Sequence, residues 1–369
     1  MIERIIIENF KSIRKLDLEL KPINILVGAN GAGKSNFISF FKLTNHIYEQ
    51  KLQEYIGNNF DKLLYFGRKR SEYTDGLFDF ENKSAFYFRL RPNIQGNSGY
   101  IYVSWFRLNR DSEKQKNYDL WSRLIFHTGG RLELEFLELK ESEERESLYV
   151  KPAREFFQSF KIYHFHDTGS DSPMKRMNPI NDNRNLRENG ENLAAFLYYL
   201  QEKYPKEFQN IENQIRSVAP FFDRFDLAPD RLNESQIELR WLEKGSDAYF
   251  NAYDLSDGTL RFMALTTLLL QPDLPKTIII DEPELGLHPF AINKLAAMMK
   301  QAAVKGSQVI VSTQSVNLVD NFEPEDVITV DRENDQSVFK RLNSEGLAEW
   351  LEDYTLGDLW NKNVIGARP

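Results

Sequence analysis

The sequence of 369 residues contains no cysteine. Disulfide bonds and thiolate metal sites are therefore excluded, and the absence is compatible with a reducing compartment. No stretch approaches the run of about 18 apolar residues that a membrane span needs. The first ten residues, MIERIIIENF, are interrupted by Glu3, Arg4 and Glu8, so they lack the apolar core of a signal peptide. We expect a cytoplasmic protein that does not span a membrane.

An excess of positive charge is also missing. The 47 basic and 55 acidic residues give a net charge of −8, so no overall polycation argues for nucleic acid. Local clusters of basic residues remain, at Arg68 to Arg70 and at Lys175, Arg176, Arg184 and Arg187. Such clusters are usually solvated surface, and contact with DNA stays open as the alternative. A hydrophobic content of 41% supplies an ample core for one large domain or two ordinary ones.

The strongest motif lies near the start of the chain, where INILVGANGAGKSN fits the pattern G-x-x-x-x-G-K-[ST]. Residues 23–27 predict a buried parallel strand, and the residues after Ser35 begin a helix, as this motif requires. Its glycines let backbone N–H groups face phosphates, Lys34 places a positive charge on the β and γ oxygens, and the Ser35 hydroxyl ligates Mg²⁺. The residues expected to bind ATP here are Asn30, Gly31, Gly33, Lys34, Ser35 and Asn36.

Two further elements follow each other late in the chain. TIIIDEPELGLHP at 277–289 is an apolar strand that ends in adjacent carboxylates, Asp281 and Glu282, an arrangement that holds Mg²⁺ and orients an attacking water. The earlier element LSDGTLR places the hydroxyl of Ser256 and the amide of Gly258 at a helix start, which suits a phosphate. Ordinary capping of the helix by Ser256 is a compatible interpretation.

The patterns between these motifs predict one interrupted nucleotide-binding domain. Residues 2–20 alternate as two strands, 63–139 alternate as an antiparallel meander, and 192–219 are helical with a break at Pro205. The polar stretch 167–190 is expected to be a loosely structured loop. The expected parts are a P-loop part at 1–60, an antiparallel β-rich subdomain at 61–170, a loop and helical insert at 171–240, and the remainder of the core at 241–369.

The motifs GANGAGKSN, LSDGTLR, IIIDEPELGLHP and the late STQS, in this order, resemble an ATP-binding-cassette (ABC) ATPase of the non-transporter kind. Comparable proteins are the RecF and SMC heads and the ATPase half of the overcoming-lysogenization-defect (OLD) nucleases. The whole chain, including YHFHDT and the closing LGDLWNKNVIGARP, is similar to bacterial predicted ATPases described as AAA_21. This resemblance implies an α/β P-loop NTPase of the ABC head type, with a mixed central sheet, an antiparallel β subdomain and a helical insert.

The resemblance also implies roles for single residues. Lys34, Glu282 and Gln314 become catalytic, with Glu282 as the general base, and Ser35 and Asp281 hold Mg²⁺. Glu282 could instead be a second solvated carboxylate. Solubility, however, poorly explains a carboxylate directly after an apolar strand. Gln314 stands where many relatives carry a switch histidine, and because an amide cannot take up a proton near neutral pH, slow turnover is expected.

The resemblance further implies that Ser256 and Gly258 close on the γ-phosphate bound by another copy, so a homodimer with two sandwiched ATP molecules is expected. Arg261 either reaches a phosphate across that dimer or pairs with a neighbouring acid. His288 falls in the dimer-facing loop, with a partly buried structural histidine as the equal alternative. Lys11, in ENFKS with Ser12, stands where related heads contact the nucleotide, and an exposed turn lysine is the alternative.

His164 and His166 stand two positions apart on one face of a predicted strand, and Asp167 follows them, a pattern that superficially resembles a metal-binding strand. The chain has five histidines, and no second cluster has ligand spacing, so a dedicated transition-metal site is not expected. The favoured interpretation is a loop that senses Mg²⁺ and the γ-phosphate, with His166 and Asp167 as the sensing residues.

The sequence therefore predicts an ATP-driven switch in a DNA-related or phage-defence process. The closed dimer is expected to be recognised by DNA or by a separate effector protein, which could be a nuclease. We expect no Toprim nuclease domain, since only a tail with Trp350 and Trp360 follows the final hairpin. A transporter subunit is disfavoured because Lys34 and Ser256 are far apart in the sequence, and a structural DNA-binding head because no long coiled coil interrupts the chain. A catalytically weak ATP sensor stays open.

Overall fold

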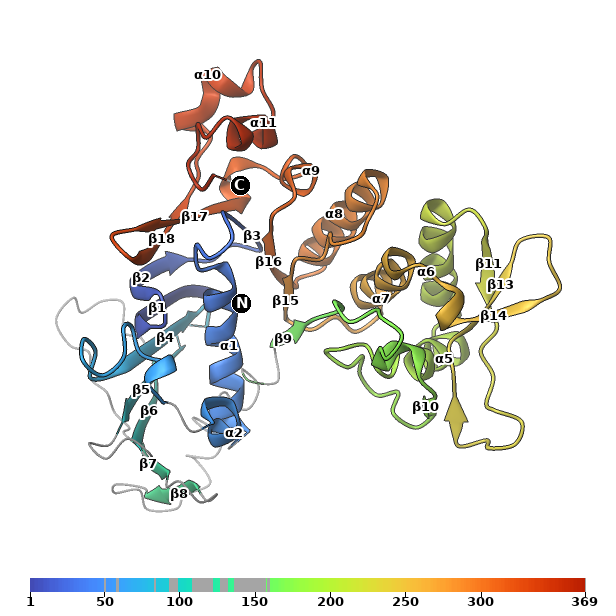
Figure 1. Cartoon of the computed structure of the whole chain (residues 1–369), viewed down its shortest axis with the longest axis horizontal. Coiled ribbons are helices and arrows are strands. Elements are labelled where there is room, and N and C mark those ends of the chain that lie inside the picture. Colours follow the sequence, from blue (N-terminus) through green and yellow to red (C-terminus); the bar gives the residue numbers. More distant parts are fainter. Residues whose placement is uncertain are drawn as a thin grey trace. The chain divides into compact units, whose positions relative to one another are not determined.

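The computed structural model describes residues 1–49, 51–57, 60–82, 84–92, 99–107, 122–126, 132–135, 157 and 160–368 (Figure 1). The chain forms two compact units. The first contains Met1–Phe160, Glu325–Gly346 and Trp360–Pro369, and the second contains Lys161–Pro324 and Leu347–Leu359.

A seven-stranded antiparallel sheet occupies much of the first unit, in the order β2-β1-β4-β5-β6-β7-β8. Its strands are β1 (Ile2–Phe10), β2 (Ile13–Glu19), β4 (Thr74–Phe80), β5 (Ser84–Pro92), β6 (Gly99–Arg107), β7 (Ser122–Phe126) and β8 (Leu132–Glu135). This confirms the predicted pair of strands at 2–20 and, where the structure describes it, the antiparallel meander. The segments of the meander between these strands at 93–98, 108–121, 127–131 and 136–139 lie outside the described residues.

The helix that follows the P-loop, α1 (Lys34–Tyr48), is anchored to this sheet by phenylalanines. The Phe40 ring lies 5.2 Å from that of Phe10, 5.8 Å from Phe78 and 5.4 Å from Phe88, measured between centroids. All four side chains are fully buried. Burial of one such ring stabilises the fold by about 1.5–3 kcal/mol, so this cluster fixes the helix that carries Lys34.

The strand before the P-loop, β3 (Ile23–Val27), pairs in parallel with β17 (Val327–Glu333), which forms the predicted hairpin with β18 (Gln336–Arg341). The C-terminal segment returns to this hairpin, because the Ala367 N–H donates to both carboxylate oxygens of Asp331 at 2.9 Å. Residues from the two ends of the sequence thus build the surroundings of the P-loop.

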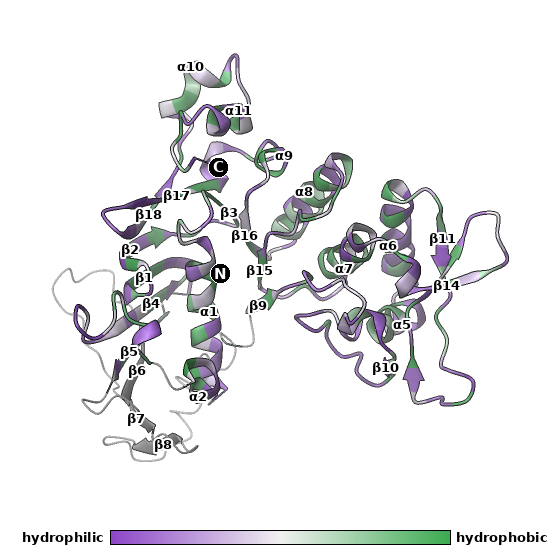
Figure 2. Ribbon diagram, in the orientation of Figure 1, coloured by the Kyte–Doolittle hydropathy of each residue, from purple (hydrophilic) through white to green (hydrophobic). Residues whose placement is uncertain are grey.

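The second unit contains the strand with the paired carboxylates, β15 (Thr277–Asp281), which pairs in parallel with β16 (Gln308–Thr313). On its other side β15 neighbours β9 (Phe160–Tyr163). The helices α7 (Asp257–Leu270) and α8 (Pro289–Val304) pack together, and α6 (Pro205–Val218) packs against both. Figure 2 shows the apolar residues that run through β15 and β16. Their burial on both faces explains why these strands lack the alternating pattern.

The helical insert confirms the predicted break at Pro205, since α5 (Leu193–Lys203) ends just before it and α6 begins with it. Two small antiparallel sheets accompany the helices. They consist of β11 (Phe222–Phe225), β13 (Arg240–Glu243) and β14 (Tyr249–Asn251), and of β10 (Asn178–Pro179) with β12 (Gln236–Ile237). Short helical segments elsewhere are α2 (Leu52–Ile56), η1 (Phe60–Lys62), η3 (Pro173–Lys175), η4 (Ala252–Asp254), α9 (Val316–Val319), η5 (Pro324–Asp326), η6 (Glu345–Leu347), α10 (Ala348–Leu351) and α11 (Leu356–Asn361).

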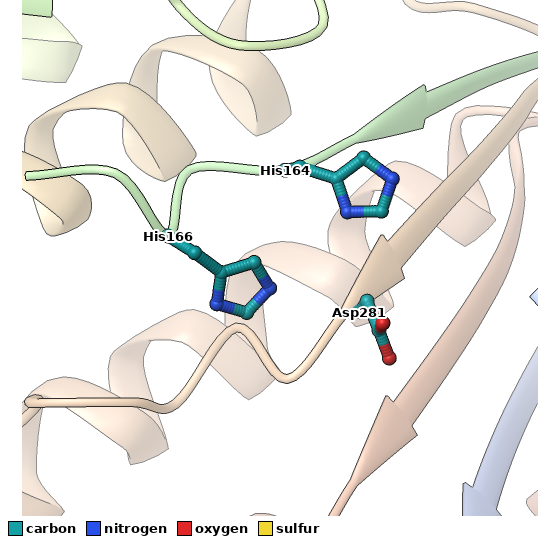
Figure 3. A group of neighbouring side chains, drawn as sticks. All are labelled: His164, His166 and Asp281. Carbon is teal, nitrogen blue, oxygen red and sulfur yellow. The ribbon is translucent and has the colours of Figure 1, made fainter. Parts of the chain in front are cut away.

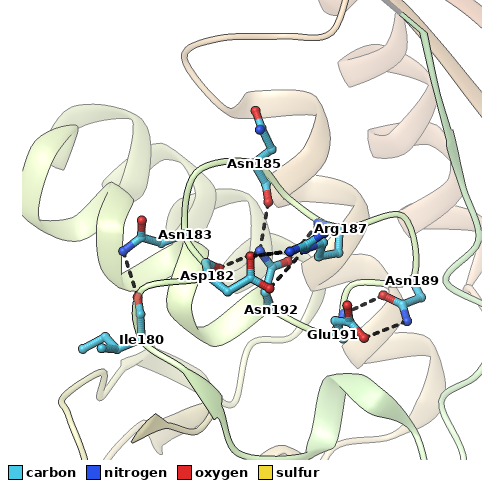
Figure 4. Close-up of polar contacts among 8 residues, drawn as sticks. All are labelled: Ile180, Asp182, Asn183, Asn185, Arg187, Asn189, Glu191 and Asn192. Atoms are coloured by element: carbon cyan, nitrogen blue, oxygen red, sulfur yellow. Dashed lines mark hydrogen bonds and ion pairs between the residues drawn. The ribbon is translucent and has the colours of Figure 1, made fainter. Parts of the chain in front are cut away.

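The polar stretch 167–190 is ordered, contrary to the expectation of a loosely structured loop. The fully buried side chain of Asn192 gathers it, because its amide donates to the carbonyls of Asp182 at 2.7 Å and Asn185 at 2.9 Å (Figure 4). Its oxygen accepts from the Arg187 N–H at 2.8 Å, and Arg187 also pairs with the Asp182 carboxylate at 3.0 Å. One amide therefore satisfies three backbone groups that the polar composition alone leaves open.

Within the described residues, none of the helices combines the length and the apolar character that crossing a bilayer requires.

Candidate functional site

The P-loop wraps around the ammonium group of Lys34. This lysine is the first residue of α1 and is only 5% exposed, and its Nζ donates to the carbonyls of Gly28 and, at 3.1 Å, of Ala29. Gly33 has a φ of 125°, and a Cβ there would lie 2.1 Å from the Ser337 hydroxyl, so no larger residue fits. Among the expected ATP-binding residues, Asn30 and Gly31 are exposed on the loop, and Ser35 is exposed in the first turn of α1.

A chain of hydroxyl and amide groups supports the loop from behind. The Asn36 amide donates to the Ser12 hydroxyl at 2.7 Å, and the Ser337 hydroxyl donates to the Ala32 carbonyl at 2.5 Å. Because Ser337 uses its proton there, Ser12 donates to Ser337 across their 2.7 Å contact. The Asn36 side chain thus supports the P-loop through Ser12. Ser337 was not predicted, because no local pattern in a hairpin marks a residue that supports a distant loop.

Lys11 lies in the turn between β1 and β2 in a left-handed conformation, with φ at 50°. Its side chain is half-buried, with Nζ 5.4 Å from the Phe10 ring centroid and 6.0 Å from that of Tyr55. Burial, followed by the nearby charge of Lys42, lowers the pKa of Lys11 from its ordinary value. Lys11 is therefore not the fully exposed turn lysine of the alternative interpretation.

Ser256 caps α7, as one of the two compatible interpretations predicts. Its hydroxyl accepts from the Thr259 N–H at 3.2 Å, and the side chain stays exposed. The next glycine, Gly258, touches the loop after β15, because a Cβ there would lie 2.2 Å from the Gly286 carbonyl oxygen. The buried Lys175 ammonium lies 3.9 Å from the exposed Asp257 carboxylate.

The two carboxylates at the end of β15 have different partners. The Ser312 hydroxyl donates to Oδ1 of Asp281, while Oε1 of Glu282 accepts from the side-chain amide of Gln314. Glu282 itself has a φ of 42°, and its N–H donates to the Ser312 carbonyl at 2.9 Å. A left-handed conformation costs a non-glycine residue on the order of 1–3 kcal/mol and is concentrated at functional sites. The structure therefore brings together the predicted base and the predicted switch residue.

A third carboxylate, Glu284, was not singled out from the sequence. It is buried and accepts from the Thr313 hydroxyl at 2.5 Å and from the Gln314 N–H at 2.9 Å. Burial raises the pKa of Glu284, and these hydrogen bonds oppose the rise. Glu284 thereby fixes the backbone of Gln314, whose side chain holds Glu282. The sequence feature that could have pointed to Glu284 is a carboxylate three residues after Asp281 and directly after Pro283.

Arg261 contacts backbone carbonyls in place of the neighbouring acid that one interpretation expected. Its guanidinium is 7% exposed and donates to three backbone carbonyls, those of Phe165 at 2.9 Å, His166 at 3.1 Å, and Leu285. Removal from water lowers the pKa of Arg261 from its ordinary value. The side chain ties the segment after β9 to the loop after β15, so it positions both.

His288 is exposed and accepts from the Phe290 N–H at 3.3 Å through Nδ1, which caps α8. His288 is thus not partly buried, but its contact as the cap of α8 is a structural one. Asp167 is likewise exposed. His166, by contrast, lines a small pocket with Arg261, Asp281 and Glu282.

The two histidines after β9 meet the aspartate at the end of β15. One candidate ligand atom from each of His164, His166 and Asp281 lies within 4.8 Å of the other two (Figure 3). The two histidines stand out as a pair in the sequence, but Asp281 was not predicted to join them, because it is more than a hundred positions away and meets them only through the neighbouring places of β9 and β15 in the sheet.

Most of the basic residues named as DNA candidates contact other groups of the chain. Arg68 pairs with Asp61 at 2.5 Å, Arg70 lies 4.7 Å from the Phe66 ring centroid, and Arg176 donates to the Asp171 carbonyl at 2.8 Å. Since Lys175 and Arg187 face acids as well, these contacts favour the interpretation of a structured surface.

The arrangement of elements matches that of solved ATPase heads. An Smc head bound to the C-terminal winged-helix domain of ScpA aligns over 94% of this chain and 99% of its own, with a TM-score of 0.61 and 16% identity. An Smc head with an extended coiled coil from Pyrococcus furiosus, bound to the C-terminal domain of ScpA, aligns over 95% and 98%, with a TM-score of 0.55 and 17% identity. The fold is that of an ABC-type P-loop ATPase head, as predicted.

The chain belongs to the AAA_21 family, described as "AAA domain, putative AbiEii toxin, Type IV TA system", whose model matches residues 23–320. It is 35% identical over 72 residues to the Old nuclease of Escherichia phage P2, and 31% identical over 122 residues to the energy-coupling factor transporter ATP-binding protein EcfA of Methanocaldococcus jannaschii. These segments are 20% and 30% of this chain and span 12% and 42% of the relatives. The predicted relationship to ABC-type ATPases of the RecF, SMC and OLD kind is confirmed.

Proposed function

We propose that the protein binds ATP with Mg²⁺ and hydrolyses it slowly at sites shared by two copies of the chain. The observation that carries this proposal is the hydrogen bond from the Gln314 amide to the strained Glu282, directly after a buried strand. Membership in a family of ABC-type ATPases supports the choice of nucleotide.

On the nucleotide side, the Lys34 ammonium exchanges the loop carbonyls for oxygens of the β- and γ-phosphates. Backbone N–H groups from Asn30 to Asn36 surround the phosphates, and Lys11 lies at the first turn of the chain as a further contact. The Ser35 hydroxyl and the Asp281 carboxylate are exposed or half-exposed oxygen donors, the kind that Mg²⁺ prefers, so they would hold the ion. When bound, Mg²⁺ neutralises charge on the phosphate oxygens.

For hydrolysis, Glu282 accepts a proton from the attacking water. The Gln314 amide holds one oxygen of this carboxylate and leaves the other for the water. His166 and Asp167 serve as sensors beside the carboxylates, a role supported by the place of His166 in the pocket with Asp281 and Glu282. Because Gln314 cannot take up a proton, no second acid or base assists, and turnover is slow.

The second copy completes the site with Ser256 and Gly258 at the start of α7. An exposed hydroxyl at the start of a 14-residue helix, where backbone N–H groups and the helix dipole favour negative charge, suits a phosphate and supports this role. His288, exposed before α8, faces the same dimer contact. The two Smc heads are bound to ScpA in their structures, so we propose that a separate effector reads the closed dimer here. Similarity to the Old nuclease suggests a DNA-related or phage-defence role.

The test is the variant Glu282→Gln, which removes the base but keeps the shape of the side chain. With ATP it should form a stable dimer that retains one nucleotide per chain, whereas Glu349→Gln, an exposed control on α10, should behave as the unchanged protein. Size-exclusion chromatography with light scattering measures both. A Glu282→Gln protein that stays monomeric and releases its ATP contradicts the proposal.

A catalytically weak ATP sensor is the second candidate, and the amide at position 314 favours it. A sensor holds ATP until the nucleotide is exchanged, so hydrolysis is no faster than exchange. Single-turnover hydrolysis and release of a fluorescent nucleotide, measured side by side, separate the two. Sustained turnover faster than exchange excludes the sensor.

A further inference from the structure

Three side chains form a group that the ATPase scheme uses only in part. His164 and His166 follow β9, and Asp281 ends β15, and their nearest nitrogen and oxygen ligand atoms lie within 4.8 Å of one another. Figure 3 shows the two rings beside the carboxylate, with ring centroids 6.1 Å apart. All three residues are half-buried, so an ion from solution reaches them while their orientation stays restricted.

The spacing is near that of ligands on one ion. Metal–ligand distances of about 2.0–2.2 Å in a tetrahedral site place two ligand atoms about 3.3–3.6 Å apart. The candidate atoms lie within 4.8 Å of one another, so binding an ion requires them to approach by up to about 1.5 Å through rotation of the half-buried side chains. Two imidazoles with one carboxylate is a donor set that first-row transition metals prefer, whereas Mg²⁺ and Ca²⁺ prefer oxygen alone.

The surrounding contacts hold the ligands in place. Arg261 donates to the backbone carbonyls of Phe165 and His166, that is, of the second histidine and of the residue before it. The Ser312 hydroxyl donates to Oδ1 of Asp281, and Oδ2 has no hydrogen bond among those described. Supporting hydrogen bonds of this kind orient metal ligands and strengthen binding.

We propose that His164, His166 and Asp281 form a binding site for one divalent transition metal ion of the Zn²⁺ class, with three protein ligands and an open position. The consequence for ATP hydrolysis rests on the proposed function. Asp281 is there an Mg²⁺ ligand, and a transition metal that occupies it withdraws its carboxylate from the nucleotide. The ion would therefore act as an inhibitor, and the histidines would set its affinity.

The absence of cysteine gives a direct test of the site itself, without nucleotide. The substitution His166→Cys introduces a single thiol in a known place. Titration of the full chain, free of any affinity tag, with Co²⁺ should then give a thiolate-to-cobalt charge-transfer band at one ion per chain. The matched control is His46→Cys on α1, which belongs to the other unit of the chain, and it should give no such band. A folded His166→Cys protein without the band overturns the proposal.

Affinity gives the second measurement. The unchanged protein and His46→Gln should bind Zn²⁺ equally, in competition with a chromophoric chelator and in excess Mg²⁺. His164→Gln removes one ligand and should weaken Zn²⁺ binding at least about tenfold. Even residues that only support metal ligands cost about 10- to 100-fold in metal affinity when they are replaced. Equal Zn²⁺ affinity in all three proteins, or complete displacement by Mg²⁺, contradicts a histidine site.

Inhibition is measured last. Zn²⁺ should slow hydrolysis by the unchanged protein at concentrations where His164→Gln is unaffected. If neither protein hydrolyses ATP, the proposed ATPase function has failed, and the cobalt band still decides the metal site. If both hydrolyse ATP and Zn²⁺ inhibits them equally, the coupling through Asp281 is wrong.

Discussion

Replacement of Gln314 by alanine tests how the amide acts on the base. In the structure its side chain donates to Oε1 of Glu282, while its backbone N–H is held separately by Glu284. Alanine removes the first contact and keeps the second, so the backbone should stay in place. A hydrogen bond to a charged group contributes about 1.5–3 kcal/mol. If the contact orients Glu282 only for hydrolysis, that energy corresponds to a rate loss of about 10- to 150-fold.

Because both side chains are only partly buried, the expected loss lies near the lower end, about tenfold. Steady-state phosphate release gives the rate, and fluorescence titration gives ATP affinity, which should change by less than about twofold. Gln301→Ala, an exposed amide on α8, is the matched control and should leave both values unchanged. A Gln314→Ala protein with the full rate, or with ATP affinity lost in proportion to rate, would refute this role.

Three predictions concern stability. Gly258→Ala places a Cβ 2.2 Å from the Gly286 carbonyl, so thermal unfolding should show a loss of about 1–3 kcal/mol; an unchanged midpoint means that the backbone yields freely. Because burial raises the pKa of Glu284, its stabilising contribution is full below the unfolded carboxyl pKa, about 4, and is lost as pH rises through the folded pKa. Glu284→Gln should therefore gain stability relative to the unchanged protein across that rise in pH. Urea unfolding measures the difference in unfolding free energy between the two proteins, and a difference that does not change with pH contradicts this prediction. Asn192→Ala removes the partner of three part-buried backbone groups and should cost about 2 kcal/mol, whereas the exposed Asn189→Ala should cost under about 0.5 kcal/mol; equal losses contradict the bracing role.

Features encoded by residues close together in the sequence were predictable. The P-loop glycines, Lys34 and Ser35 form one contiguous motif, and a buried strand followed by a helix is its normal setting. The break at Pro205 follows from the missing N–H of proline, and the cap at Ser256 from its place before an apolar helix. The two solved Smc heads confirm the fold that these local motifs implied.

Contacts between distant segments were not predictable. Arg261 binds backbone carbonyls, which carry no side-chain signature, so these partners were not among those expected. The group of His164, His166 and Asp281 depends on which strand lies next to β15, and the order of strands in a sheet does not follow from local sequence patterns. Asn192 orders a loop whose polar composition is equally typical of a flexible segment.

The shared site of two copies is the central claim, and mixing two inactive variants tests it directly. One variant carries Lys34→Ala, which disables its P-loop, and the other carries Ser256→Asp, which keeps the helix cap but repels a phosphate. In a mixed dimer one site combines the intact P-loop of the second variant with the intact α7 start of the first. An equal mixture should therefore recover about a quarter of the unchanged protein's ATPase rate, as half of the dimers each contain one working site. No recovery in a mixture shown to form mixed dimers would contradict the claim.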